Sequence, residues 1–218
     1  MKIVSFGDIH MATAHMEAIS AELASADVVL LSGDLTNFGG PRAVRQVIRV
    51  AQTYCPIVRA LPGNLDQPET IAFLRTEQVG LHGEHQCYGE VTIYGCGGSN
   101  LTPFQTPLEY TDEILWQILQ QAVADVPPTP CHIMVCHTPP YATRLDRLVD
   151  GRPVGSPAVR QFIAEKQPHL CITGHIHESP GVDTIGRTKI LNAGPFAAGG
   201  YIVAQYEGGV LDAELRFM

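Results

Sequence analysis

The fold is decided by three apolar runs in the first 66 residues, each of which ends in a polar cluster: KIVSFGDIH (2–10), DVVLLSGD (27–34) and PIVRALPGNLD (56–66). Apolar runs of this length predict buried strands. Residues 13–25 and a segment that opens at Pro41 keep apolar residues at helical spacing, which predicts two helices between the strands. The order strand, helix, strand, helix, strand is typical of parallel strands joined by right-handed crossovers.

The rest of the chain continues this pattern less regularly. A short helix is predicted after Pro68, strands within 79–96, a glycine-rich loop over 95–100, strands over 132–136 and 170–173, and antiparallel strands in the tail. A helix from Thr111 is expected to turn Ile114, Leu115, Ile118, Leu119 and Ala122 inward, and Ser156 to cap a later helix. Residues 138–155 are long for a loop, which often indicates function.

Composition restricts the kind of protein. A chain of 218 residues with 45% hydrophobic and 17% charged residues predicts one α/β domain over residues 1–218. A net charge of -8 without a Lys/Arg cluster argues against a broad nucleic-acid surface or an anionic-membrane surface. The six cysteines form no CxxC pair, and most lie inside apolar runs. We therefore expect free thiols and, since no signal peptide or membrane span is evident, a cytoplasmic protein.

The polar clusters supply a set of metal ligands. They contain two Asp, one Asn and four His: Asp8, His10, Asp34, Asn64, His137, His175 and His177. Because each cluster ends a predicted strand, these side chains should meet at one edge of the sheets. Asp8 and His10 can reach one ion, whereas His175 and His177 can share an ion or divide between two. Gly33 and Gly63 allow the sharp turns that bring the backbone close to the site.

Mixed nitrogen and oxygen ligands suit Mn, Fe, Zn, Co or Ni, and we expect two divalent ions, with manganese favoured. Two ions about 3.5–4 Å apart can share a carboxylate, hold a hydroxide and clamp a phosphoryl group for in-line attack. Each cluster taken singly is also explained by ordinary turn or core chemistry. Their joint position at strand ends favours the metal site.

The order DxH, GD, GN, H, GHxH resembles the calcineurin-like metallophosphoesterases, in particular their small prokaryotic phosphodiesterase-like members. The resemblance runs from Asp8 to His177. It implies a four-layer sandwich of two mixed β-sheets flanked by helices. It also implies that Asp34 bridges two metals, and that Asn64 lies near the substrate phosphate. The first metal would be bound by Asp8, His10 and His177, and the second by Asn64, His137 and His175. Asp34, Asn64 and His137 would form the catalytic set.

One position departs from the pattern of this family. Many members carry a His, assigned to substrate binding or leaving-group protonation, where this chain has Leu65. Leucine transfers no proton, and loss of a positioned acid costs ~10²–10⁴-fold on a poor leaving group. We therefore expect phosphodiesters or activated esters rather than phosphomonoesters. His82 and His85 are candidate replacements only if their loop reaches the site. Residues 33–39 also lack the Asp-Arg pair of protein phosphatases.

Several loop residues are candidates for substrate contact, although turn and surface roles are as common. They are Asn37, Asn100 and Arg144 for the phosphate, and Phe104 and Tyr141 for stacking on an aryl or base group. We expect Asp66 to cap the helix near Pro68 rather than to orient Asn64. Asn192 is expected either to hydrogen-bond a metal ligand or to contact backbone beside the metals.

Besides a phosphomonoesterase with the same two ions, two rival functions remain open at this point. A non-catalytic scaffold on the same fold is one, since the retromer subunit that resembles phosphoesterases also lacks the His replaced here by Leu65. A mononuclear hydrolase that uses only some of the ligands is the other. The seven intact ligand positions favour an enzyme that acts on a small phosphate ester.

Overall fold

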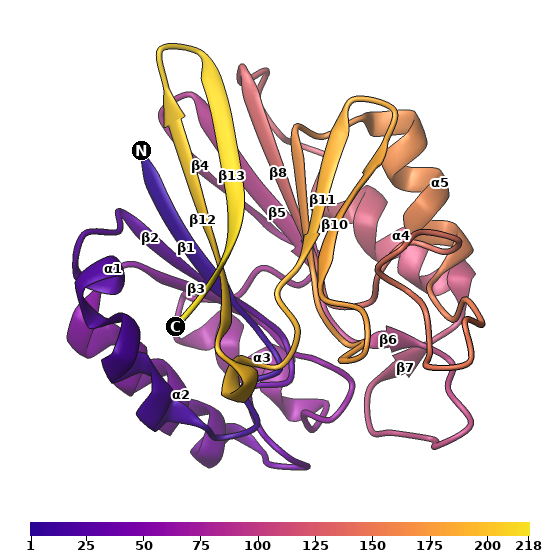
Figure 1. Cartoon of the computed structure of the whole chain (residues 1–218), viewed down its shortest axis with the longest axis horizontal. Helices are drawn as coiled ribbons and strands as arrows, with labels where there is room; N and C mark the ends of the chain where they lie inside the picture. Colours follow the sequence, from indigo (N-terminus) through magenta and orange to yellow (C-terminus); the bar gives the residue numbers. More distant parts are fainter.

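Two β-sheets pack face to face in the computed structural model, which describes residues 1–218 (Figure 1). The first sheet has the strand order β13-β12-β1-β2-β3. Its strands are β1 (Lys2–Phe6), β2 (Val28–Ser32), β3 (Val58–Leu61), β12 (Gly200–Glu207) and β13 (Val210–Phe217). Strands β1, β2 and β3 run parallel, and β12 and β13 extend the sheet as the antiparallel hairpin expected in the tail.

The second sheet has the order β10-β11-β9-β8-β5-β4. Its strands are β4 (His85–Tyr88), β5 (Val91–Cys96), β8 (Cys131–Cys136), β9 (Leu170–Thr173), β10 (Gly181–Ile185) and β11 (Thr188–Asn192). The four central strands are parallel, and the edge strands β4 and β10 are antiparallel to their neighbours. A separate short pair joins β6 (Ser99–Asn100) to β7 (Glu109–Tyr110).

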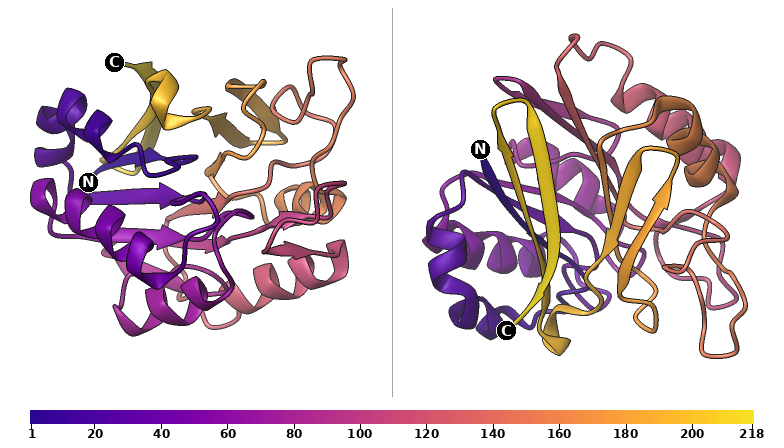
Figure 2. Two further views of the ribbon diagram at one scale, coloured as in Figure 1. Left: turned by 90° about the horizontal axis from the view of Figure 1, so that it is seen from below. Right: turned by 45° about the horizontal axis from the view of Figure 1, so that its top comes forward.

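Helices cover the outer face of each sheet, which confirms the four-layer sandwich (Figures 1 and 2). The 3-10 helix η1 (Thr13–Ile19), α1 (Ser20–Ala24), α2 (Pro41–Tyr54) and α3 (Glu69–Thr76) lie on the first sheet, and α4 (Asp112–Ala122) and α5 (Pro157–Lys166) on the second. The 3-10 turn η2 (Phe196–Ala198) precedes β12. Along β2, Val29 and Leu31 face the helices while Val28 and Leu30 face the other sheet. This burial on both faces explains the uninterrupted apolar runs of the parallel strands.

Three local predictions are corrected. Residues 13–25 form a 3-10 helix and a short α-helix instead of one helix, and no side chain caps the N-terminus of η1. The expected loop over 95–100 is largely strand, because β5 stays paired with β8 through Cys96 and Ser99–Asn100 forms β6. Ile114 is 42% exposed, since Leu115, Leu119 and Ala122 set the buried face of α4.

Other predictions are confirmed. The side chains of Thr111 and Ser156 accept hydrogen bonds at the N-termini of α4 and α5. All six cysteines are free, and five of them are buried. None of the helices has the length and apolar character that crossing a membrane requires.

Strands β1, β2, β3, β8 and β9 end at the same end of the molecule, the lower end in Figure 1, so the polar clusters that follow them gather there.

Candidate metal centre

The first group of ligand atoms combines the loop after β1 with the loop after β9. His177 Nε2 lies 3.1 Å from Asp8 Oδ1 and 3.4 Å from His10 Nε2. One nitrogen of each histidine and one oxygen of Asp8 are mutually within 4.8 Å. Asp8 is buried, whereas His177 reaches solvent. The group therefore opens towards the surface on the His177 side.

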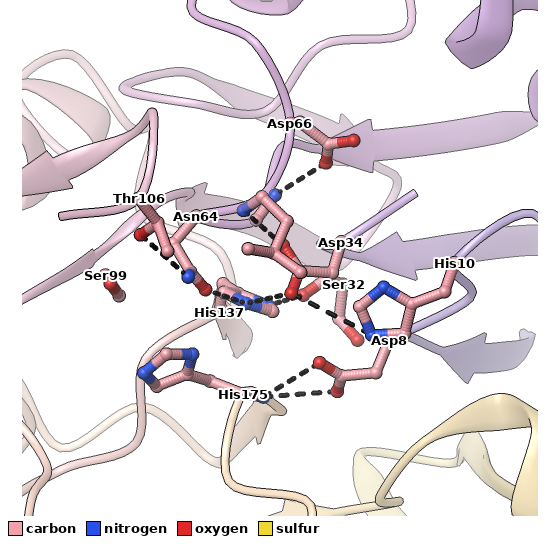
Figure 3. Close-up of polar contacts among 12 residues, drawn as sticks. Asp8, His10, Ser32, Asp34, Asn64, Asp66, Ser99, Thr106, His137 and His175 are labelled. Atoms are coloured by element: carbon pink, nitrogen blue, oxygen red, sulfur yellow. Dashed lines mark hydrogen bonds and ion pairs between the residues drawn. The ribbon is translucent and has the colours of Figure 1, made fainter. Parts of the chain in front are cut away.

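The second group lies deeper and combines Asp8, Asp34 and His137. His137 is fully buried at the end of β8, and its Nδ1 donates to the carbonyl of Ser32 at 3.0 Å. A carbonyl only accepts, so this bond fixes the ring and directs Nε2 into the centre. There Nε2 lies 3.2 Å from Asn64 Oδ1 and 3.6 Å from Asp34 Oδ2 (Figure 3).

Asp34 lies between the two groups. Its Oδ2 is 3.6 Å from His137 Nε2 and 4.0 Å from His10 Nε2, so one carboxylate oxygen faces both (Figure 3). Its Oδ1 accepts the backbone N–H of Leu65 at 2.8 Å, which holds the carboxylate in this orientation.

His175 and Asn64 complete the arrangement. The backbone N–H of His175 donates to Asp8 at 3.1 and 3.2 Å, and its ring lies 5.4 Å from that of His137, centroid to centroid. The Nδ2 of Asn64 donates to the hydroxyl of Thr106 at 2.9 Å, which turns Oδ1 towards His137. All seven side chains named from the sequence thus converge on one place.

The backbone around the centre is strained. Asp8, His10, Asp34 and His175 have φ values of 48°, 48°, 45° and 68°, in the left-handed region that side chains rarely adopt. Such strain is typical of sites where the fold holds groups for function. At Gly33, with φ 108°, a Cβ would lie 2.3 Å from His137 Nδ1. The predicted close approach of the backbone to the site is therefore confirmed at Gly33.

Burial and charge act against each other on the titratable groups. Burial lowers the pKa of His175 to about 4, so its imidazole is neutral at pH 7. Burial alone would also lower the pKa of His137, but the carboxylates of Asp34 and Asp8 raise it to about 10. Burial opposes ionisation of Asp8, yet the hydrogen bond from His177 and the neighbouring imidazoles hold its pKa below the usual range.

The donor set fits divalent cations. Carboxylate, amide and imidazole ligands suit Mn, Fe, Zn, Co or Ni, and no thiol takes part. Histidines that bind metals usually donate their second ring nitrogen to a carbonyl or a carboxylate, as His137 does to Ser32. The ligand atoms of Asp8, His10 and His177 lie close enough together for one cation to contact all three.

The role predicted for Asp66 is wrong. Its carboxylate caps no helix and instead accepts the backbone N–H groups of Leu35, Thr36 and Gly63 at 2.9–3.0 Å. It thereby ties the loop after β2 to the loop after β3. Burial and the charge of Asp34 raise the pKa of Asp66 to about 6. In the sequence, Asp66 two residues before Pro68 looks like a helix cap. Only the tertiary contacts show that it ties two loops together instead.

Asn192 contacts backbone, which is one of its two expected roles. Its Nδ2 donates to the carbonyls of Ile176 and Ser179, each at 3.0 Å, and its Oδ1 accepts the N–H of Gly194 at 2.8 Å. These bonds hold the loop that carries His175 and His177.

Sequence reasoning missed the residues that hold Asn64. The Thr106 hydroxyl accepts from Asn64 and donates to Glu109 Oε1 at 2.6 Å. Glu109 also accepts from the backbone and hydroxyl of Thr102. These bonds outweigh burial and keep the pKa of Glu109 below its usual range. Two threonines before a glutamate in one loop were the only signal available.

A cleft of about 740 Å³ opens beside Asn64, His175 and His177. Residues 100–104, after β5, and residues 148–154, in the long loop after β8, form its walls. Asn64, Asn100 and Phe104 are among the lining residues, so the cleft contains three of the predicted substrate contacts.

The other predicted contacts lie outside the residues that line the cleft. Asn37, Tyr141 and Arg144 are exposed, and the backbone N–H of Arg144 donates to Asp183. His82 accepts from the backbone of Gly97, and His85 lies against the carbonyl of Ala122. Neither histidine contacts the metal centre.

Known proteins are similar to this chain in sequence or in fold. The family described as calcineurin-like phosphoesterase matches residues 1–179. An uncharacterised protein of Methanocaldococcus jannaschii is 34% identical over 200 residues, which cover 89% of this chain and 88% of that protein. The crystal structure of the protein TT1561 of Thermus thermophilus superposes with a TM-score of 0.74 at 17% identity, covering 98% of this chain and 97% of that one. Vps29 of Entamoeba histolytica, crystallised with zinc, superposes with a TM-score of 0.51 at 12% identity, covering 100% and 99%. The two structures establish likeness of fold alone.

Proposed function

Because the chain belongs to the calcineurin-like phosphoesterase family, we propose that it hydrolyses phosphodiesters with two divalent metal ions bound at the centre described above. One observation carries the proposal: Asp34 Oδ2 faces His10 on one side and His137 on the other. A single carboxylate oxygen between two ligand groups is the arrangement that a bridging ligand requires.

The residues divide between two ions in this proposal. Asp8, His10 and His177 hold the first ion, Asp34 bridges, and Asn64, His137 and His175 hold the second. Proximity supports the first set, since its three ligand atoms are mutually within 4.8 Å. For the second set, the support is that Asn64 Oδ1 and His137 Nε2 face each other at 3.2 Å. Because ligands come from both sheets, we also propose that residues 1–218 act as one domain.

The protein groups supply orientation and charge. When bound, two divalent ions supply Lewis acidity and a water molecule acidic enough to act as a nucleophile near neutral pH. The carbonyl of Ser32 and the N–H of Leu65 fix the ring of His137 and the carboxylate of Asp34 before substrate arrives. The amide of Asn64 lines the cleft, and the second hydrogen of its Nδ2 is free to meet a phosphate oxygen while the first stays bonded to Thr106.

Two features favour diesters over monoesters as substrates. Leu65, at the position where the pattern of the family it resembles has a histidine, offers no proton to a poor leaving group. Arg152 is the one Lys or Arg side chain that lines the cleft, and its Nε lies 3.7 Å from Asp150 Oδ2. A diester carries one negative charge, so it needs less cationic compensation than a monoester dianion.

A paired measurement tests the proposal. Metal content is determined on the purified protein, and Mn²⁺-dependent hydrolysis of bis(4-nitrophenyl) phosphate is compared with that of 4-nitrophenyl phosphate. We expect two ions per chain and faster turnover of the diester. Asp34→Asn should reduce both metal content and turnover to background. Full activity with one ion per chain would support a mononuclear enzyme, and faster turnover of the monoester would support a phosphomonoesterase.

The alternative is a protein-interaction scaffold. The fold shared with Vps29 and the leucine at position 65 favour it. The convergent donor groups argue against it, because a scaffold has no need of side chains held by strained backbone around the buried carboxylates of Asp8 and Asp34. Bound metal without turnover of either ester would support the scaffold.

A further inference from the structure

The cleft beside the metal centre has an apolar surface that no part of the chain covers. Three side chains on its walls are unusually exposed for their type: Leu101 at 63%, Phe104 at 82% and Val149 at 90%. Leu101 and Phe104 lie in the loop between β6 and β7, and Val149 in the long loop after β8; both loops lie at the lower right of Figure 1. Apolar side chains exposed together beside polar ligands are typical of ligand-binding grooves.

Hydrogen bonds at the base of the loop between β6 and β7 hold the wall that carries Phe104 in place. Glu109 accepts hydrogen bonds from the backbone and hydroxyl groups of both Thr102 and Thr106. Thr106 in turn binds the amide of Asn64, one of the candidate metal ligands. The apolar tip of the loop is therefore positioned relative to the centre, although the tip itself touches solvent.

The opposite wall is held in the same way. Asp146 is fully buried and accepts the backbone N–H groups of Ala142, Thr143 and Gly155 at 2.9–3.1 Å. Asn100 joins the two walls, since its Nδ2 donates to the carbonyl of Val154 at 3.1 Å. Two braced walls joined at their base form a preorganised slot, and preorganisation reduces the entropic cost of binding.

Charge restricts what the slot can take. Its charged residues apart from histidine are Asp150, Arg152 and Glu178, and Arg152 is already close to Asp150. No free cation is left for a second phosphate group. An apolar slot that begins at the metal ligands and carries no net positive charge suits a substrate with one phosphate and one apolar ester group.

We propose that the slot between Phe104 and Val149 binds an aromatic group esterified to the substrate phosphate, and so selects aryl-type phosphodiesters for the metal centre. This rests on the proposed function for the location of the phosphate. Phe104 supplies a face for stacking, and Leu101 and Val149 bury the remainder of the ring.

Binding of two phosphonates tests the inference without turnover. Phenylphosphonate and methylphosphonate are titrated calorimetrically into the Mn²⁺-loaded protein, with inorganic phosphate as a reference. Burial of the ring should make phenylphosphonate bind about tenfold more tightly than methylphosphonate. The double variant Phe104→Ala, Val149→Ser should bind both about equally and leave the affinity for phosphate unchanged.

The matched control is Phe217→Ala, Val210→Ser, which removes exposed side chains of the same types outside the cleft. It should keep the tenfold preference. Equal binding of the two phosphonates by the unaltered protein, no binding of either, or a preference that survives the cleft variant would each overturn the inference. Tighter binding of phenylphosphonate than of methylphosphonate, without hydrolysis of any diester, would support the aromatic-binding slot and refute the proposed function.

Discussion

Asn64 depends on a hydroxyl group for its orientation. Without the bond from Nδ2 to Thr106, the amide can rotate and present nitrogen where oxygen is needed. Thr106→Val, which keeps the shape of the side chain, should weaken binding of the second metal about 10–100-fold, the usual cost of losing an outer partner of a ligand. Thr106→Ser should restore most of the affinity. Calorimetric titration with Mn²⁺ measures both, and an unchanged affinity in the valine variant would contradict this role.

We expect His137 to couple metal binding to the release of a proton. Its pKa of about 10 in the metal-free protein means that it is protonated at pH 7.5, whereas a metal ligand must be neutral. Metal binding should therefore release about one proton from His137, and affinity should rise with pH up to about 10. Calorimetry at pH 7.5 in buffers of different ionisation enthalpy counts the protons released. An apparent enthalpy that is the same in all buffers would show that His137 is already neutral.

The connection after β2 allows only glycine at its turn. Gly33 has φ 108°, and a Cβ there would meet the ring of His137. We expect Gly33→Ala to cost about 3 kcal/mol of unfolding free energy, from backbone strain and the displaced ring together. For a chain of this size that corresponds to a Tm about 10 °C lower, measurable by circular dichroism. Gly208→Ala is the control, since its φ of 58° imposes backbone strain but its Cβ would meet nothing. Equal losses in the two variants would mean that contact with His137 is unimportant.

The two sheets meet at the candidate metal centre. Asp8, His10, Asp34 and Asn64 follow strands of the first sheet, and His137, His175 and His177 follow strands of the second. Bound ions should thus hold the sheets together, and removing them with a chelator should lower the Tm by several degrees. Ligand at 100 times its Kd contributes about 2.7 kcal/mol, which is about 5–10 °C for a chain of this size. Readdition of Mn²⁺ should restore the Tm, but not in Asp34→Asn. A Tm that does not change when metal is removed would argue that the ions do not bind ligands from both sheets.

The sequence by itself determined most of the order of elements and the set of candidate ligands. Apolar runs buried on both faces predict parallel strands, and polar clusters at their ends predict a shared edge, because both follow from local periodicity and strand direction. This is why Asp8, Asp34 and His137 could be named before the fold was known.

Only the tertiary structure decided which residues support that set. Asp66 ties two loops together because residues 31 positions apart, Asp66 and Leu35, meet in space, and Thr106 turns Asn64 across 42 positions. The apolar slot likewise needs two loops that the sequence separates by some forty residues. Local patterns carry no information on such pairings, because they arise when the two sheets pack and fix which loops lie side by side.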